Sequence, residues 1–215
     1  MARGQQIVRL DTEVRTPLPP AIEDLLLGGL ERALVGAEAC VLSDYQKGVL
    51  SARVSARSIA GARRSGCPIV VDPKGADFSR YRGCTVVTPN IHELETATGA
   101  VVDGEEALLA AAAQLLDILD GAAVLATRGA AGMSLVRRGH EPRHVSTAAQ
   151  RVYDVTGAGD TVVSLLALAL AAGLSLEQAM ELANRAAGIV VGKLGASTVT
   201  WDELGDALAA VERFG

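Results

Sequence analysis

Residues 68–75 read Pro-Ile-Val-Val-Asp-Pro-Lys-Gly, a short β-branched run that ends in polar residues and a glycine. A strand that is apolar at every position is typical of a parallel sheet with both faces covered by helices. Runs of the same kind recur at residues 6–10, 39–43, 84–89 and 122–128. The recurrence predicts an open α/β sheet built from several such strands.

The segments between these runs carry signals for the start of helices. Ser51 predicts a helix through Arg64, and three pairs have the spacing of a capping box: Asp103 with Glu106, Ser175 with Gln178, and Thr200 with Glu203. Strand–helix–strand units of this length predict right-handed crossovers and a mostly parallel sheet. Residues 132–146 predict a hairpin at one edge, because two short runs flank Arg138-Gly139-His140.

Composition excludes several classes of protein. The chain has 215 residues, of which 49% are hydrophobic and 21% charged, with a net charge of −5. These values exclude a disordered chain and disfavour a nucleic-acid binder, and the length predicts a single domain over residues 1–215. The most apolar stretch, residues 162–174, is too short to span a membrane and predicts a buried helix.

The cysteines and the N-terminus indicate the compartment. Cys40, Cys67 and Cys84 are odd in number and lack the spacing of a zinc site or a disulfide framework. The first residues contain no apolar leader segment. We therefore expect a cytoplasmic protein without a structural metal.

Polar residues follow one predicted strand after another. In open α/β sheets, ligands bind beyond the carboxyl ends of the strands. Five polar segments stand just after apolar runs, at residues 43–48, 72–75, 88–93, 127–132 and 154–160. Their succession predicts a binding or catalytic site at this edge of the sheet.

The most specific segment is Asp154-Val-Thr-Gly-Ala-Gly-Asp160, which precedes the apolar helix. Small residues at positions 157–159 allow backbone N–H groups to face one space, where the helix dipole adds positive potential. An anion hole for a phosphate is the result, and Asp160 beside it can accept a hydroxyl proton. The four letters GAGD alone arise by chance in roughly one of forty such chains. The alternative is a helix N-terminus with an Asp cap and packing glycines.

The other segments are less specific, and each allows a structural alternative. Asn90 and Glu93 share a helix face and can hold waters of a hydrated Mg²⁺, or they are an N-cap and a first-turn glutamate. Lys74 can pair with a phosphate, or it is a solvated loop lysine. Thr127, Gly129 and Gly132 can bring the backbone close to a nucleotide, or they only shape a turn. Asn184 can contact a nucleotide, or it is an exposed helix residue. Asp44, Tyr45 and Lys47 can contact the substrate, or they are solvated loop residues.

Together these motifs resemble the ribokinase, or pfkB, family of sugar kinases. Residues 154–160 look like its C-terminal signature, Asn90-x-x-Glu93 like its Mg²⁺ motif, and Thr127-x-Gly129 like its nucleotide loop, in the expected order. A closer resemblance is to the kinase domain of the heptose-phosphate kinases of the ADP-heptose pathway. It rests on residues 5–11, 44–48, 71–75 and 88–90, and extends from about Gln5 to the C-terminus.

The resemblance implies a ribokinase-like three-layer α/β/α fold, with ATP and Mg²⁺ as cofactors. It implies Asp160 as catalytic base and Gly157, Ala158 and Gly159 as the anion hole. It also implies nucleotide contacts from Lys74, Thr127, Gly129 and Asn184. Some relatives bind a monovalent cation such as K⁺ near the residues that match Asp154, Thr156 and Ser197.

The expected reaction is transfer of the γ-phosphoryl group of ATP to a sugar or sugar-phosphate hydroxyl. By resemblance to the subgroup, the acceptor is the anomeric hydroxyl of D-glycero-D-manno-heptose 7-phosphate. The alternatives are a ribokinase- or fructokinase-like enzyme acting on an unphosphorylated sugar, and a silent nucleotide-binding or dimerisation module. The expected partners are ATP and the sugar phosphate, with neither nucleic acid nor membrane, and a homodimer is left open.

In the family, a segment with the first strands, a sugar-binding turn and a β-sheet lid precedes the match to residues 5–6. The resemblance therefore predicts an incomplete domain that lacks the N-terminal strands and the lid. This expectation fits three alternatives: a truncated or mis-started chain, a chain that works with a partner, and a degenerate nucleotide-binding module. Missing strands also predict an open sheet edge.

Overall fold

The computed structural model describes residues 12–13, 15–149 and 152–205. Its centre is a six-stranded sheet whose strands lie side by side in chain order. The first four strands are parallel and the last two are antiparallel to their neighbours. Their bounds are β1 (Cys40–Ser43), β2 (Ile69–Asp72), β3 (Val86–Val87), β4 (Ala123–Thr127), β5 (Met133–Val136) and β6 (Arg143–Val145). The prediction of a mostly parallel sheet is confirmed, whereas the expected strand at residues 6–10 lies outside the described residues.

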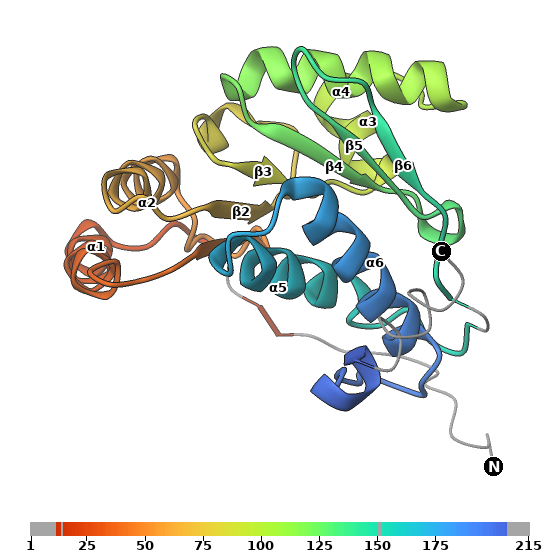
Figure 1. Cartoon of the computed structure of the whole chain (residues 1–215). Coiled ribbons are helices and arrows are strands. Elements are labelled where there is room, and N and C mark those ends of the chain that lie inside the picture. Colours follow the sequence, from red (N-terminus) through yellow and green to blue (C-terminus); the bar gives the residue numbers. More distant parts are fainter. Residues whose placement is uncertain (1–11, 14, 150–151, 206–215) are drawn as a thin grey trace.

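Helices cover the sheet on both sides and make three layers (Figure 1). Successive parallel strands are neighbours, so crossovers of one hand bring the connecting helices to the same face. That face carries α1 (Pro20–Ala33), α2 (Ala52–Arg64), α3 (Ile91–Thr98) and α4 (Glu105–Leu119), with the short 3₁₀ helices η1 (Ser79–Tyr81) and η2 (Gly129–Ala131) in the connections. The opposite face carries α5 (Ala158–Ala171) and α6 (Leu176–Val191).

The two cores explain the continuously apolar strands. In β2, Val71 packs into the core under α2 and α4, whereas Val70 packs into the core under α5 and α6. Both side chains are fully buried. In β1 the second face is covered only in part, and Val41 on that face is 43% exposed. Within the described residues β1 pairs with β2 alone, which leaves its other edge open.

The helix-start signals are confirmed in three cases out of four. Ser51 accepts a hydrogen bond from the Val54 N–H, and the pairs Ser175 with Gln178 and Thr200 with Glu203 form reciprocal capping boxes. The capping box expected at Asp103 is wrong, because the N-cap of α4 is Gly104 at φ 103° and no side chain caps the helix. Among the described residues, no helix is both long and apolar enough to cross a membrane.

The expected hairpin is formed by β5 and β6, and its return depends on Gly132. Gly132 has φ 87° and ψ −133°, a region of backbone conformation that only glycine adopts readily. A Cβ atom there would lie 2.0 Å from the Val145 carbonyl oxygen. Gly132 is therefore required by the hairpin itself, whatever it contributes to a ligand.

We expect Gly132→Ala to lower the free energy of unfolding by at least about 2 kcal/mol, because strain and a backbone clash add. Gly129→Ala is the matched control, since Gly129 has φ 56° and open space around the added Cβ. It should cost only about 1 kcal/mol. Urea denaturation of both variants measures the two free energies of unfolding. Equal losses of stability would contradict the conclusion that the hairpin requires Gly132.

Candidate active site

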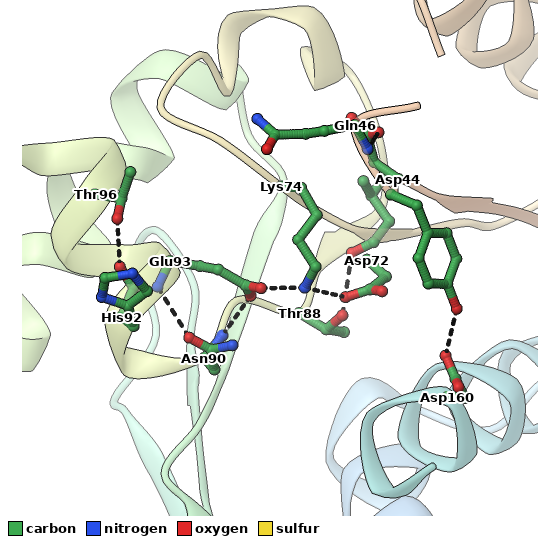
Figure 2. A network of polar contacts seen from close by, with 12 residues as sticks. Asp44, Gln46, Asp72, Lys74, Thr88, Asn90, His92, Glu93, Thr96 and Asp160 are labelled. Carbon is green, nitrogen blue, oxygen red and sulfur yellow. Dashed lines mark hydrogen bonds and ion pairs between the residues drawn. The ribbon is translucent and has the colours of Figure 1, made fainter. Parts of the chain in front are cut away.

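A cleft of about 210 Å³ opens where the carboxyl ends of the parallel strands meet the N-terminus of α5 (Figure 2). The structure thus gathers polar strand ends that lie far apart in the sequence. Its lining residues are Tyr45, Asp72, Lys74, Thr88, Asn90, Glu93, Thr127, Gly157, Gly159, Asp160 and Val162.

The N-terminus of α5 presents unpaired backbone donors to this cleft. Gly157 is the N-cap at φ 82°, a left-handed conformation that suits glycine. Among the described residues, no acceptor pairs with the N–H groups of Gly157, Gly159 or Asp160. The N–H of Ala158 is not available, because it donates to the Val155 carbonyl oxygen at 3.2 Å. Of the expected anion hole at Gly157, Ala158 and Gly159, the N–H groups of Gly157 and Gly159 are thus unpaired in the described residues, together with that of Asp160, and the helix dipole lies behind them.

Asp160 lies in the first turn of α5 with its side chain exposed. Its Oδ1 atom accepts a hydrogen bond from the Tyr45 hydroxyl at 3.1 Å, although the two residues are 115 positions apart in the chain. A carboxylate beside unpaired N–H donors can take a proton from a hydroxyl while the donors hold a phosphoryl group.

Lys74 lies between two carboxylates on the opposite wall (Figure 2). Its ammonium donates a hydrogen bond to Glu93 and is 3.9 Å from Oδ1 of Asp72. Burial alone would lower the pKa of Lys74, but the bond to Glu93 and the charge of Asp72 outweigh it and raise that pKa. Lys74 is thus a cation at neutral pH in the lining of the cleft.

Asp72 is a member of the site that sequence reasoning did not select. Burial raises its pKa to about 6, the charge of Lys74 opposes that rise, and the carboxylates of Glu93 and Asp160 add to it. Thr88 was missed as well; its hydroxyl donates to the Val71 carbonyl oxygen at 3.1 Å. The available signal was position, since each residue stands at or just beyond a strand's carboxyl end.

Asn90 and Glu93 form a capping box at the start of α3. Oδ1 of Asn90 accepts from the Glu93 N–H at 2.9 Å, and Oε2 of Glu93 accepts from the Asn90 N–H at 2.9 Å. The N-cap interpretation is therefore confirmed, and both residues also line the cleft. Within the described residues no group of three or more His, Cys, Asp or Glu side chains could hold a metal ion.

Other candidate residues lie outside the cleft lining. Asp44 is buried behind it, and Lys47 pairs with Glu13 at 2.9 Å. The Asn184 side chain is 8% exposed and donates to the Ser146 carbonyl oxygen at 2.8 Å, so the exposed-helix alternative is wrong. Gly129 and Gly132 flank η2 at the start of the hairpin.

The residues expected to hold a monovalent cation lie in two neighbouring loops. Oδ1 of Asp154 accepts from the Thr156 N–H at 2.9 Å and from its hydroxyl at 2.7 Å. These bonds lower the pKa of Asp154. Ser197 donates to the Leu194 carbonyl oxygen at 3.3 Å.

Comparison with known proteins identifies the family. The model of the pfkB family carbohydrate kinases matches residues 19–203. The chain belongs to this family. It is 50% identical over 203 residues to the bifunctional protein HldE of Paramagnetospirillum magneticum, covering 94% of this chain and 42% of that protein. It is 48% identical over 208 residues to HldE of Vibrio cholerae strain M66-2, and the match covers 97% of this chain and 43% of that protein. The chain thus spans less than half the length of these relatives.

Solved structures of similar fold confirm the ribokinase-like architecture. Arabidopsis thaliana ribokinase, complexed with ribose and ATP, aligns with a TM-score of 0.73 at 25% identity, covering 86% of this chain and 59% of that one. Escherichia coli phosphofructokinase-2, in complex with potassium, aligns with a TM-score of 0.76 at 20% identity, and the alignment covers 92% of this chain and 64% of that one.

The raised pKa of Asp72 predicts a pH-dependent stability. Folding penalises the charged form, so the penalty is absent below about pH 4, grows as the pH rises, and is complete above the folded pKa of about 6. As the pH rises from 4 to 7.5, we expect the free energy of unfolding of Asp72→Asn to increase by on the order of 2 kcal/mol relative to that of wild type.

Urea denaturation at pH 4, 6 and 7.5 measures this difference. Asp77→Asn is the control, because hydrogen bonds from Ser79 lower the pKa of Asp77, so that the stability its carboxylate contributes is already present above about pH 4. The difference in stability between that variant and wild type should therefore change little from pH 4 to pH 7.5. A difference between Asp72→Asn and wild type that does not change with pH would contradict the prediction.

Proposed function

We propose that this chain is the ATP-binding and catalytic portion of a kinase that phosphorylates a sugar or sugar-phosphate hydroxyl. The observation that carries the proposal is the Asp160 carboxylate beside the unpaired N–H groups of Gly157 and Gly159, in one cleft with Lys74. A base, an anion hole and a fixed cation are the parts that phosphoryl transfer requires.

In the proposed reaction, Asp160 accepts the proton of the attacking hydroxyl. The hydroxyl oxygen forms a bond to the γ-phosphorus of ATP as the bond to the β-phosphate oxygen breaks. The N–H groups at the start of α5 hold the transferring phosphoryl group, and Lys74 balances phosphate charge as a point cation. ADP leaves with the β-phosphate oxygen.

ATP, Mg²⁺ and K⁺ are the proposed cofactors. Mg²⁺ supplies neutralisation of phosphate charge, and the cleft suits it because Glu93 Oε1 already holds one cation, the Lys74 ammonium. Asn90 and Glu93 would hold Mg²⁺ through water, since Mg²⁺ accepts few protein ligands. Thr127, Gly129, Gly132 and Asn184 are the proposed nucleotide side. For K⁺ we propose Asp154, Thr156 and Ser197; the potassium complex of phosphofructokinase-2, a protein of the same fold, prompts the choice of ion and not of residues.

The proposed acceptor is the anomeric hydroxyl of D-glycero-D-manno-heptose 7-phosphate, which gives the 1,7-bisphosphate. It is supported by identities of 47–50% to proteins named HldE. Lys47 remains the proposed contact on the acceptor side, with the Tyr45 ring beside it. The open edge of β1 supports association with a second copy, and three buried free thiols support a cytoplasmic location.

We expect Asp160→Asn to lower kcat by about 10²- to 10⁴-fold, because it removes the proton acceptor. The Kd for ATP should stay within about threefold, since the N–H groups and Lys74 are retained. Asp202→Asn is the matched control, an exposed aspartate in the first turn of the helix that follows Thr200. ADP release with heptose 7-phosphate measures turnover, and calorimetry measures ATP binding.

The same assays separate the alternatives. Higher kcat/KM with ribose or fructose would favour a kinase for unphosphorylated sugars. ATP binding without turnover of any acceptor would favour the silent module. Wild-type turnover in Asp160→Asn would show that the base is another residue.

A further inference from the structure

The turn after β1 is held by a buried carboxylate. Asp44 is 3% exposed, and each of its oxygens is used inside the protein. Its Oδ1 accepts from the Gln46 N–H at 2.8 Å, whereas Oδ2 accepts from Arg80 Nη1 at 2.9 Å and from the Tyr81 hydroxyl at 2.6 Å. Asp44 is therefore committed to the interior and cannot also face a substrate.

These bonds determine the path of the next residues. Gln46 adopts φ 53°, a left-handed conformation that a non-glycine residue keeps only where its surroundings enforce it. The turn approaches the loop after β2 so closely that a Cβ on Gly75 would lie 2.3 Å from Gln46 Nε2. Arg80 also donates to the Leu50 carbonyl oxygen at 3.2 Å, which fixes the far end of the same loop.

The braced turn directs Tyr45 across the cleft to α5. Tyr45 is 55% exposed, yet its hydroxyl lies 3.1 Å from Oδ1 of Asp160. The Lys47 ammonium lies 5.8 Å from the centre of the Tyr45 ring. In the described part of the chain, the Tyr45 hydroxyl is the sole side-chain partner of Asp160 that the hydrogen-bond geometry shows.

We infer that Tyr45 is a positioning residue for Asp160, and that Asp44, Arg80 and Tyr81 form the brace that holds Tyr45 in place. An exposed aspartate has several rotamers, and a base is effective only when its oxygen points at the proton it accepts. By donating to Oδ1, Tyr45 leaves Oδ2 for the acceptor hydroxyl. The acceptor proton passes to Oδ2, while Tyr45 keeps its own proton throughout. The inference rests on the proposed function for its catalytic consequence.

The kinetic test compares Tyr45→Phe with Tyr45→Ala. If the hydroxyl acts through Asp160, Tyr45→Phe lowers kcat by about 10- to 100-fold, with KM for the acceptor and Kd for ATP within about threefold. The kcat of Tyr45→Ala should then be no more than about threefold lower than that of Tyr45→Phe. Tyr153→Phe is the matched control, because Tyr153 is 57% exposed. Normal kcat in Tyr45→Phe with a loss in Tyr45→Ala would assign the role to the ring and overturn the inference.

A second measurement does not depend on turnover. The chain contains three tyrosines, so protein labelled with ¹³C at the tyrosine ζ carbon gives three signals, and Tyr45→Phe assigns one of them. Asp160→Ala should shift the Tyr45 signal and leave that of Tyr153 in place. Tyr81→Phe, which removes one bond of the brace, should also shift the Tyr45 signal and lower kcat.

The two measurements separate the inference from the function on which it rests. A Tyr45 signal that does not respond to Asp160→Ala overturns the inference, whether or not the chain is a kinase. A signal that responds in a protein that phosphorylates no acceptor overturns the proposed function and leaves the contact between Tyr45 and Asp160 in place.

Discussion

The parallel pairing of β1 to β4 is the constraint on which the candidate site depends. Parallel strands in register place all their carboxyl ends at one edge, and Ser43 pairs directly with Asp72 there. The layer of α5 and α6 packs on the opposite face of the sheet from α2 and α4, and brings the first turn of α5 to the same edge. The Asp160 carboxylate and the unpaired N–H groups at the start of α5 thereby face the same cleft as the Lys74 ammonium, which follows β2.

The cleft holds more carboxylates than cationic side chains. Asp72, Glu93 and Asp160 are three carboxylates served by one ammonium, that of Lys74. The raised pKa of Asp72 expresses burial first, which the charge of Lys74 opposes and the carboxylates of Glu93 and Asp160 reinforce. Under the proposed function, a divalent cation that arrives with ATP relieves this excess, and the phosphates give Lys74 a partner other than Glu93.

Much of the site could be predicted because it is encoded locally. Lys74, Asn90, Glu93, Thr127 and Asp160 follow apolar runs, and all five line the cleft. Asp72 and Thr88 escaped selection because the same strand-end position also suits structural residues. The role of Asp44 could not be predicted, because its partners Arg80 and Tyr81 stand 36 and 37 positions away and carry no spacing signal.

The sequence by itself determined the α/β class, the polar strand ends, most helix starts and the family, because each depends on residues that are near neighbours in the chain. The tertiary structure alone decided which polar groups face the cleft. It turned Asp44 inward, bound the Asn184 amide to Ser146, paired the Ala158 N–H with the Val155 carbonyl oxygen and set Tyr45 against Asp160. Each of these outcomes depends on whether a hydrogen-bond partner from elsewhere in the fold comes within reach, which local spacing does not specify.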